Sequence, residues 1–431
     1  MASTADEDQR AADPAGPAVS PVPAGAAGAR EAAGAVPAWG ARLLVVGLVL
    51  AALNLRPAVT SLGALLKEVR ADLGMSGAVA GLLTSVPAFC FAVVGLAAPR
   101  LARRFGAAAV VCGGMAAIAA GLALRPYAGG VPGFLALSVL ALAGIAVSNV
   151  LMPLVVKRWF PDRVGPMTGV YSMAIAAGAA GAAAITVPLT DAMGHHWRLG
   201  LGAWALLAAA AALLWLAAAR PGRTGGAAAP ATAAQDVPRT SITRSPTAWA
   251  LGIFFGIQAT GAYIVMGWIP AIFRDAGVPA STAGLLSAVT MLTGIPLAFV
   301  LPRLAPRLPH QGVLVVALAC FGLAGYAGLW LAPAAGAWVW AVLLGVSNSA
   351  FTLALTLIGM RARTGGGVVR LSAFAQSTGY LISIPGPLLV GWLNETTGGW
   401  DVPLALMAAL MVPQVVAGVL AGRDRTVEDE L

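Results

Sequence analysis

Stretches of about 20 mainly apolar residues recur along the whole chain, and they constrain its fold more than any other feature. Each stretch is long enough to cross the ~30 Å hydrocarbon core of a bilayer, because an α-helix rises about 1.5 Å per residue. Twelve such stretches can be read, at residues 42–62, 77–98, 107–125, 134–156, 165–189, 198–219, 248–272, 281–301, 311–331, 336–360, 370–393 and 402–420. The sequence therefore predicts an all-α membrane protein with twelve transmembrane helices.

The composition excludes a soluble protein and most enzymes. Of the 431 residues, 59% are hydrophobic and only 10% are charged, whereas a soluble domain has about 25% charged residues. The apolar stretches contain no His, Asp or Glu at depth, so an acid–base pair or a metal-ligand group cannot assemble there, and we expect no enzyme, no metal and no cofactor. The net charge of +9 is not gathered on one polar face, which argues against a nucleic-acid partner.

The positive charges indicate how the chain crosses the membrane. With the N-terminus inside, 20 of the 26 Lys and Arg residues fall in cytoplasmic segments. Five fall on the outer side, namely Lys67, Arg70, Arg125, Arg198 and Arg274. Cytoplasmic loops carry the excess of Lys and Arg in membrane proteins. We therefore expect a multi-pass protein of the cytoplasmic (inner) membrane, acting as a monomer, with both termini in the cytoplasm.

The second half of the chain repeats the first. Ala80-Gly-Leu-Leu83 and Pro99-Arg-Leu-Ala102 recur 203 residues later, beginning at Ala283 and Pro302. These matches predict two related six-helix bundles, which in transporters place the substrate between them near the bilayer midplane. The predicted divisions are a disordered tail at 1–38, a bundle at 39–220, a cytoplasmic linker at 221–247, a bundle at 248–422 and a tail at 423–431.

Several motifs are characteristic of one transporter family. They are Asn54-Leu-Arg-Pro57, Asn149-Val-Leu-Met-Pro153, Met167-Thr-Gly-Val-Tyr171, Phe255-Gly-Ile-Gln258, Trp268-Ile-Pro270 and Gln376-Ser-Thr-Gly-Tyr380. Together they resemble the CynX/NimT (cyanate/2-nitroimidazole transporter) family of the major facilitator superfamily, from about residue 42 to 420. The resemblance implies the major facilitator fold and a gating loop made of Gly95, Arg100, Arg103 and Arg104. Pro99 stands where the superfamily's loop has an aspartate.

Arg56 is the single charged residue well inside an apolar stretch, roughly 21 Å along the helix from Arg42. An intramembrane charge is costly and normally faces a cavity or a partner. Its planar guanidinium could bind an anion or a nitro group through two parallel hydrogen bonds. The alternatives are that it snorkels to the outer interface or pairs with Asp72 or another outer-side acid.

Other polar and aromatic side chains lie at comparable depths. The predicted substrate-binding set comprises Arg56, Asn54, Gln258, Tyr380, Asn149, Tyr171, Asn348, Gln376 and Trp268. Each Asn or Gln could instead make an interhelical hydrogen bond that holds the bundle together. Trp268 could instead be an interface anchor.

The predicted function is secondary active or facilitative transport, by alternating access, of a small anion or small polar organic solute such as cyanate or a nitroimidazole. The alternative is a proton-driven multidrug exporter of the same superfamily, which would usually show an intramembrane carboxylate. A proton as coupling ion is left open, with Asp72, Asp191 and Glu395 near the outer ends of the apolar stretches. A phosphate-binding Gly-x-x-x-x-Gly-Lys-Ser/Thr loop is absent from the sequence, which argues against ATP-driven transport.

Overall fold

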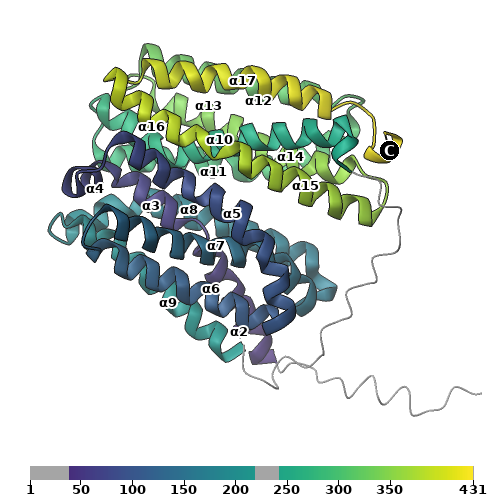
Figure 1. Ribbon diagram of the computed structural model, residues 1–431, viewed down its shortest axis with the longest axis horizontal. Coiled ribbons are helices and arrows are strands. Elements are labelled where there is room, and N and C mark those ends of the chain that lie inside the picture. Colours follow the sequence, from purple (N-terminus) through teal and green to yellow (C-terminus); the bar gives the residue numbers. More distant parts are fainter. Residues whose placement is uncertain (1–37, 219–241, 431) are drawn as a thin grey trace, which may run out of the picture. The chain divides into compact units, whose positions relative to one another are not determined.

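The computed structural model contains the predicted helices, which follow one another along the chain as two groups (Figure 1). The structure describes residues 38–218 and 242–430; the predicted N-terminal tail, except for residue 38, and the linker up to residue 241 lie outside the described residues. The described residues from 43 onward, 43–218 and 242–430, belong to one compact unit. Every regular element within the described residues is helical, so the chain is all-α as expected.

The first group contains α2 (Ala38–Leu53), α3 (Pro57–Ala64), α4 (Leu66–Leu73), α5 (Gly77–Phe105), α6 (Ala107–Leu124), η1 (Arg125–Tyr127), α7 (Val131–Trp159), η2 (Pro161–Arg163), α8 (Val164–Ala192) and α9 (Trp197–Ala218). The second contains η3 (Ile242–Arg244), α10 (Pro246–Asp275), α11 (Ala280–Leu304), η4 (Ala305–Arg307), α12 (Gly312–Leu331), α13 (Ala337–Asn348), α14 (Ala350–Met360), α15 (Gly365–Ser383), α16 (Pro385–Thr397), α17 (Asp401–Ala421) and η5 (Val427–Asp429). We call the two groups the N-terminal half and the C-terminal half.

Eleven helical segments among the described residues are long and apolar enough to cross a membrane. The twelfth predicted span, residues 370–393, corresponds to α15 and α16, which meet at Ile384. Pro385 opens α16, and because proline lacks an N–H it cannot continue the hydrogen-bond ladder of α15. Each of the twelve predicted spans therefore corresponds to one helix or to two successive shorter helices.

The first span is also broken. Pro57 is the first residue of α3 and Arg56 is its N-cap. The backbone N–H groups of Asn54 and Leu55 instead bond three residues back, to the carbonyls of Ala51 and Ala52. This tighter turn ends α2 in the middle of the predicted span. Broken helices at mid-membrane depth are a feature of substrate sites in transporters.

The two halves meet closely at the end that the charge distribution predicts to be outside. There α5 packs against α16 and α8 packs against α11. A Cβ at Gly81 would lie 2.7 Å from the Leu388 Cα, and a Cβ at Gly284 would clash with the Ala183 carbonyl oxygen. Small residues at these positions let the helix backbones approach, as in other membrane bundles.

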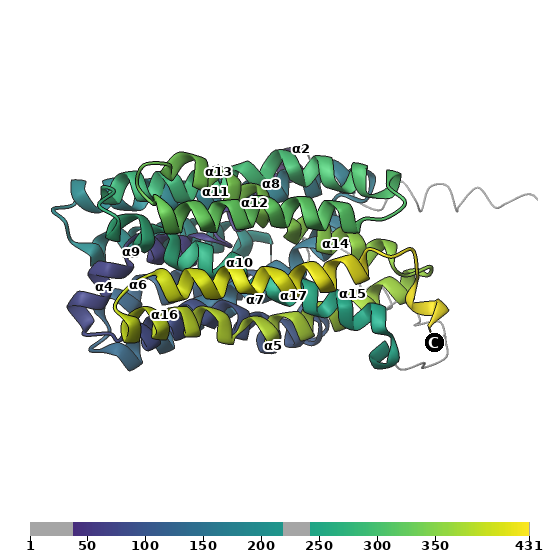
Figure 2. The same ribbon diagram turned by 90° about the horizontal axis from the view of Figure 1, so that it is seen from above.

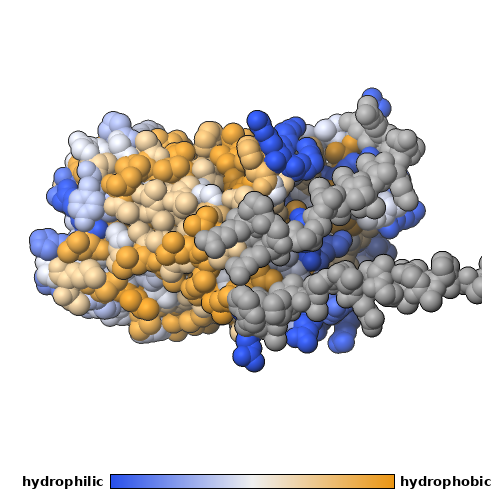
Figure 3. Space-filling model, turned by 90° about the horizontal axis from the view of Figure 1, so that it is seen from below, coloured by the Kyte–Doolittle hydropathy of each residue, from blue (hydrophilic) through white to orange (hydrophobic). Residues whose placement is uncertain are grey.

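The surface matches a membrane-embedded protein. Figure 2 shows the helices running alongside one another, and Figure 3 shows hydrophobic side chains forming a broad belt on one face, with hydrophilic side chains toward both ends. Leu206, Leu213, Phe89, Val313 and Val412 are examples of large apolar side chains that are exposed. Such a contiguous apolar surface is stable in lipid and not in water.

Candidate functional site

Arg56 lies at the break between α2 and α3 with its side chain half-buried. Within the described part of the chain its guanidinium makes one hydrogen bond, a donation to the Leu55 carbonyl at 3.3 Å, and no ion pair. Asp72, which the sequence left open as its partner, is paired with Arg198 at 2.6 Å. Arg56 therefore keeps most of its donors available at the middle of the first span.

Three tyrosines lie within electrostatic range of this charge, and they come from both halves. The Arg56 guanidinium is close enough to act electrostatically on the hydroxyl groups of Tyr171 on α8, Tyr263 on α10 and Tyr380 on α15. Tyr171 and Tyr380 were predicted site residues, whereas Tyr263 was not. One cation and three hydroxyl groups, which can each donate or accept a hydrogen bond, therefore lie within electrostatic range of one another.

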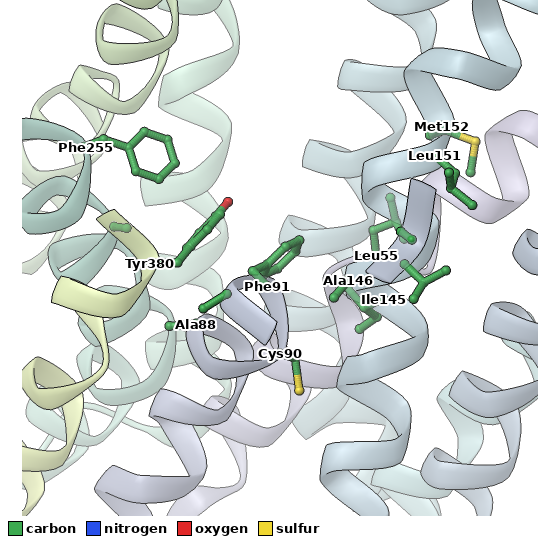
Figure 4. Close-up of a cluster of buried hydrophobic side chains, with 14 of the residues drawn as sticks. Leu55, Ala88, Cys90, Phe91, Ile145, Ala146, Leu151, Met152, Phe255 and Tyr380 are labelled. Atoms are coloured by element: carbon green, nitrogen blue, oxygen red, sulfur yellow. The ribbon is translucent and has the colours of Figure 1, made fainter. Parts of the chain in front are cut away.

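Aromatic rings continue the site into the C-terminal half. The Tyr380 ring is stacked on Phe91 of α5, with centroids 5.0 Å apart and planes inclined by 17°. Its edge also meets the Phe255 ring at 5.2 Å, and Phe255 contacts Phe351 at 5.1 Å. Figure 4 shows the Tyr380 ring between Phe255 and Phe91. The Phe91–Tyr380 stack is a direct contact between the two halves.

The predicted amide residues divide between two places. In the N-terminal half, Asn149 accepts a hydrogen bond from the Tyr171 hydroxyl at 2.8 Å, so it supports one of the tyrosines. In the C-terminal half, Gln258 donates to the carbonyl and side-chain oxygens of Asn348 at 3.1 and 3.2 Å. Gln376 bonds within its own helix, to Ser372 at 2.6 Å.

Asn54 and Trp268 are engaged elsewhere. The Asn54 amide donates to the carbonyls of Leu50 at 2.7 Å and Leu207 at 3.2 Å, which joins α2 to α9. Trp268 is fully buried and packs edge-on against Trp400, in the cluster of apolar residues at the predicted outer end of the C-terminal half. The hydrogen bonds of Asn54 and the Trp268–Trp400 ring contact thus hold neighbouring segments together.

The predicted gating loop is largely helical. Helix α5 continues to Phe105, so Arg100, Arg103 and Arg104 project from its last turns and the connection to α6 is Gly106 alone. All three arginines are exposed, and they form no ion pair within the described residues. Gly95 lies one turn earlier on the helix and is buried. With Pro99 in the place of an aspartate, this segment offers basic groups without a carboxylate beside them.

Sequence reasoning missed several members of the site. Phe91, Tyr263 and Phe351 are aromatic residues within apolar stretches, where such residues are common and carry no signal of their own. Gln414 was also missed, although it donates to the Gln258 carbonyl oxygen at 2.7 Å. A polar residue in an apolar stretch was the available signal for Gln414.

The assembled group has the chemistry to hold a small solute. A guanidinium offers two parallel donors to a carboxylate-like or nitro group, and aromatic faces can cover a flat, conjugated molecule. Groups of three or more His, Cys, Asp or Glu that could hold a metal ion are not found among the described residues. The guanidinium and the aromatic faces together are suited to binding and releasing a small solute.

Comparison with known proteins gives the same picture. The Major Facilitator Superfamily model matches residues 44–384. The chain is 34% identical over 385 residues to the uncharacterized transporter YycB of Bacillus subtilis (strain 168), covering 89% of this chain and 94% of that protein. It is 33% identical over 386 residues to the 2-nitroimidazole transporter of Escherichia coli (strain K12), covering 89% and 96%.

A third relative is the cyanate transport protein CynX of Escherichia coli (strain K12), which is 30% identical over 374 residues, with 86% of this chain and 94% of that protein covered. Among solved structures, the xylose transporter XylE from E. coli superimposes with a TM-score of 0.70 at 12% identity, covering 89% of this chain and 97% of that one. The fold and these relatives agree: the chain belongs to the CynX/NimT family of transporters within the major facilitator superfamily.

Proposed function

We propose that this transporter moves a small anion, or a small polar solute bearing a nitro or similar acceptor group, across the cytoplasmic membrane by alternating access. The observation that carries the proposal is the Arg56 guanidinium, which lies without a carboxylate partner among the described residues, beside tyrosines of both halves. Relatives named for 2-nitroimidazole and cyanate support the same class of substrate. Both of those solutes carry compact hydrogen-bond acceptor groups, which a guanidinium can bind through two parallel N–H donors.

The site residues act in distinct roles under this proposal. Arg56 binds the acceptor group, and the hydroxyls of Tyr171, Tyr263 and Tyr380 complete its hydrogen bonds. Phe91 and Tyr380 cover the solute from the two halves, so that separating the halves exposes it. Asn149 orients Tyr171 through the 2.8 Å hydrogen bond.

The runner-up, a proton-driven multidrug exporter, has less support. Such a protein would need a titrating group along the transport route. Within the described spans, acidic residues lie toward the helix ends; Asp72 and Asp191, for example, pair with Arg198 and His195. Glu395 accepts the Gly77 N–H at 2.8 Å and caps the start of α5. The coupling ion stays open under the proposal.

The decisive experiment is uptake into proteoliposomes containing the purified chain, with cyanate, nitrate, small carboxylates and nitroimidazoles offered in turn. For the solute that is transported, we expect Arg56→Ala to lower transport at least tenfold. Arg56→Lys should fail nearly as badly, because an ammonium keeps the charge and loses the planar two-donor geometry. A snorkelling arginine would instead tolerate lysine, whose long stem reaches the interface equally well.

Arg70→Ala is the matched control, since Arg70 lies on the neighbouring α4, with no ion pair within the described residues and away from the aromatic group. It should transport at the wild-type rate. Unchanged substrate affinity in folded Arg56→Ala protein would end the proposal.

A further inference from the structure

Exposed side chains form a continuous row along one face of α5. The apolar members are Leu82, Phe89, Val93 and Leu96, which are between 44% and 55% exposed. The row ends in Arg100, Arg103 and Arg104, which are exposed as well. From Leu82 to Arg100 the members are three, four or seven residues apart, and the last two follow Arg100 by three and four residues. This spacing places them on one face of the helix.

The row lies on the outside of the helix bundle. Phe91, which stacks on Tyr380 of the other half, follows Phe89 by two residues. Two residues correspond to about 200° around an α-helix, so Phe91 is on the opposite face. Leu82 is exposed although its neighbour Gly81 packs against α16, where the two halves are in contact. Figure 2 shows α5 along one edge of the molecule, so its exposed row faces the lipid.

The arginines of this row lie at the depth of the lipid headgroups. Helix α5 has 29 residues and is therefore roughly 43 Å long, whereas the hydrocarbon core is about 30 Å thick. At its outer end the Gly77 N–H donates to the Glu395 carboxylate at 2.8 Å. Its last turns therefore extend beyond the hydrocarbon at the end that the charge distribution predicts to be cytoplasmic. There the Arg104 guanidinium lies 5.1 Å from the ring centroid of Phe105, which is exposed as well.

The helices packed against α5 supply no counter-charge at this end. Helices α6, α7 and α15 contain no acidic residue. The acidic residues of α10 and α16, Asp275 and Glu395, lie at the outer end. Across residues 38–218 and 242–430, none of the three arginines forms an ion pair. Their charge is thus available to an anion that lies against the row.

We propose that this row is the binding surface for one anionic phospholipid of the cytoplasmic leaflet. The lipid phosphate accepts hydrogen bonds from Arg100, Arg103 and Arg104, because a guanidinium binds a phosphate through two parallel donors. An acyl chain lies along Leu96 and Val93. The cytoplasmic leaflet supplies such lipids and attracts basic groups next to a span. A zwitterionic lipid fits less well, because its ammonium group would meet three cations and no carboxylate.

Phosphatidylglycerol is the probe, and phosphatidylethanolamine is the zwitterionic comparison. The purified full-length chain is stripped of lipid in detergent, titrated with each lipid and examined by native mass spectrometry. One phosphatidylglycerol molecule should bind at a lower concentration than phosphatidylethanolamine. Glycerol 3-phosphate should not displace it, because this soluble phosphate has no acyl chain to lie along the apolar part of the row.

Substitution of the three arginines tests the location. Replacing Arg100, Arg103 and Arg104 by Gln should weaken phosphatidylglycerol binding roughly 100-fold, since each basic group near an anionic surface contributes about fivefold.

The matched control removes the same number of charges elsewhere. Arg163, Arg423 and Arg425 are exposed at the same end of the molecule, and each is next to an acidic residue in the chain, Asp162 or Asp424. Replacing these three arginines by Gln should keep the wild-type affinity.

Equal affinities of the two triple variants for phosphatidylglycerol would overturn the proposal, as would equal binding of the two lipids by the wild-type chain. Displacement of phosphatidylglycerol by glycerol 3-phosphate would assign the arginines to a soluble phosphate and overturn the lipid assignment. If the α5 triple variant does not fold, its three single variants decide, each with an expected loss of about fivefold. None of these results bears on Arg56 as the substrate residue.

Discussion

Three amide side chains from three helices of the C-terminal half hydrogen-bond to one another. Gln258 on α10 donates to Asn348 at the end of α13 and accepts from Gln414 on α17 at 2.7 Å. Both ends of the Gln258 amide are therefore occupied. These hydrogen bonds are the interhelical contacts that the sequence left open as an alternative for Gln258 and Asn348.

Replacing one of these amides should destabilise the protein. Gln258→Leu leaves the buried Gln414 donor unpaired, so we expect a loss of about 1–3 kcal/mol in the free energy of unfolding. Gln414→Leu should cost a similar amount, and the double variant should cost less than the sum, because the two residues share one bond. Denaturant unfolding in detergent measures these values. Gln376→Leu is the control: its amide bonds within α15, so a loss as large as that of Gln258→Leu would contradict the argument.

At the residue scale, the sequence could locate Arg56 but not Arg125. Arg56 was evident because a charge inside an apolar stretch is rare, and Pro57 beside it indicates a broken helix. Arg125 stands at the end of an apolar stretch, where a basic residue is normally solvated, and only the packing of α7 and α9 against η1 reveals its burial. Phe91 and Tyr263 were missed for a different reason: an aromatic residue in a membrane span has no unusual neighbour in the sequence.

At the scale of helices, the spans could be predicted because the length of each apolar stretch alone determines them. The interruptions within the spans could be predicted only in part. The breaks at Pro57 and Pro385 follow from the missing proline N–H. The break between α13 and α14 at Ser349 has no proline, so neither composition nor spacing indicated it. The ends also differ: α5 runs to Phe105 and α7 to Trp159, beyond the predicted 98 and 156, because polar last turns remain helical outside the hydrocarbon.

The C-terminal segment after α17 caps the start of α10. The Glu430 carboxylate accepts hydrogen bonds from the Thr247 N–H at 3.0 Å, from the Thr247 hydroxyl at 2.7 Å and from the Ser245 hydroxyl. Burial raises the pKa of Glu430, but these hydrogen bonds together outweigh it, so the pKa lies below its ordinary value of 4.5. The ionised carboxylate also lies at a helix N-terminus, where negative charge is stabilised.

This cap should depend on pH. A depressed pKa means that the stabilisation is fully present above the ordinary value of 4.5 and is lost as the pH falls through the lower, folded-state value. The protection of the Thr247 amide against hydrogen exchange, measured relative to the intrinsic exchange rate at each pH, should therefore fall on acidification. In Glu430→Gln the exchange should already be faster at neutral pH and should show no such transition. A transition of the same size in that variant would assign it to another group.

At the scale of the whole molecule, the charge distribution predicts which end faces the cytoplasm. Gly365 and Gly399 lie at opposite ends of the α15–α16 span, and a Cβ at either would meet open space, so cysteine should be tolerated at both. In a background lacking Cys90, Cys112 and Cys320, a membrane-impermeant maleimide should label Gly399→Cys in intact cells. Gly365→Cys should react only after the membrane is opened. The reverse pattern would refute the predicted orientation.

Two ion pairs join the halves at the predicted outer end. Arg274 on α10 donates to both carboxylate oxygens of Glu68 on α4, at 2.9 and 2.6 Å, and Lys67 pairs with Asp275 next to it. Hydrogen bonds and ion pairs between the halves are confined, among the described residues, to this end. The halves are therefore joined at the outer end in this structure. We expect the two ion pairs to stabilise this state relative to a state in which the halves are separated at the outer end.

Charge reversal at Glu68 should shift this equilibrium. Ala288 is buried with Ala180 and Ala183 between α11 and α8, so Ala288→Cys reports separation of the halves by its rate of maleimide labelling. Glu68→Lys should raise that rate about two- to fivefold, because partly exposed pairs contribute up to about 1 kcal/mol. Combining Glu68→Arg with Arg274→Glu should return it to the wild-type value. Asp72→Lys is the control, since its pair with Arg198 lies within one half; an equal rise in that variant would show that surface charge alone, and not the contact between the halves, controls the labelling.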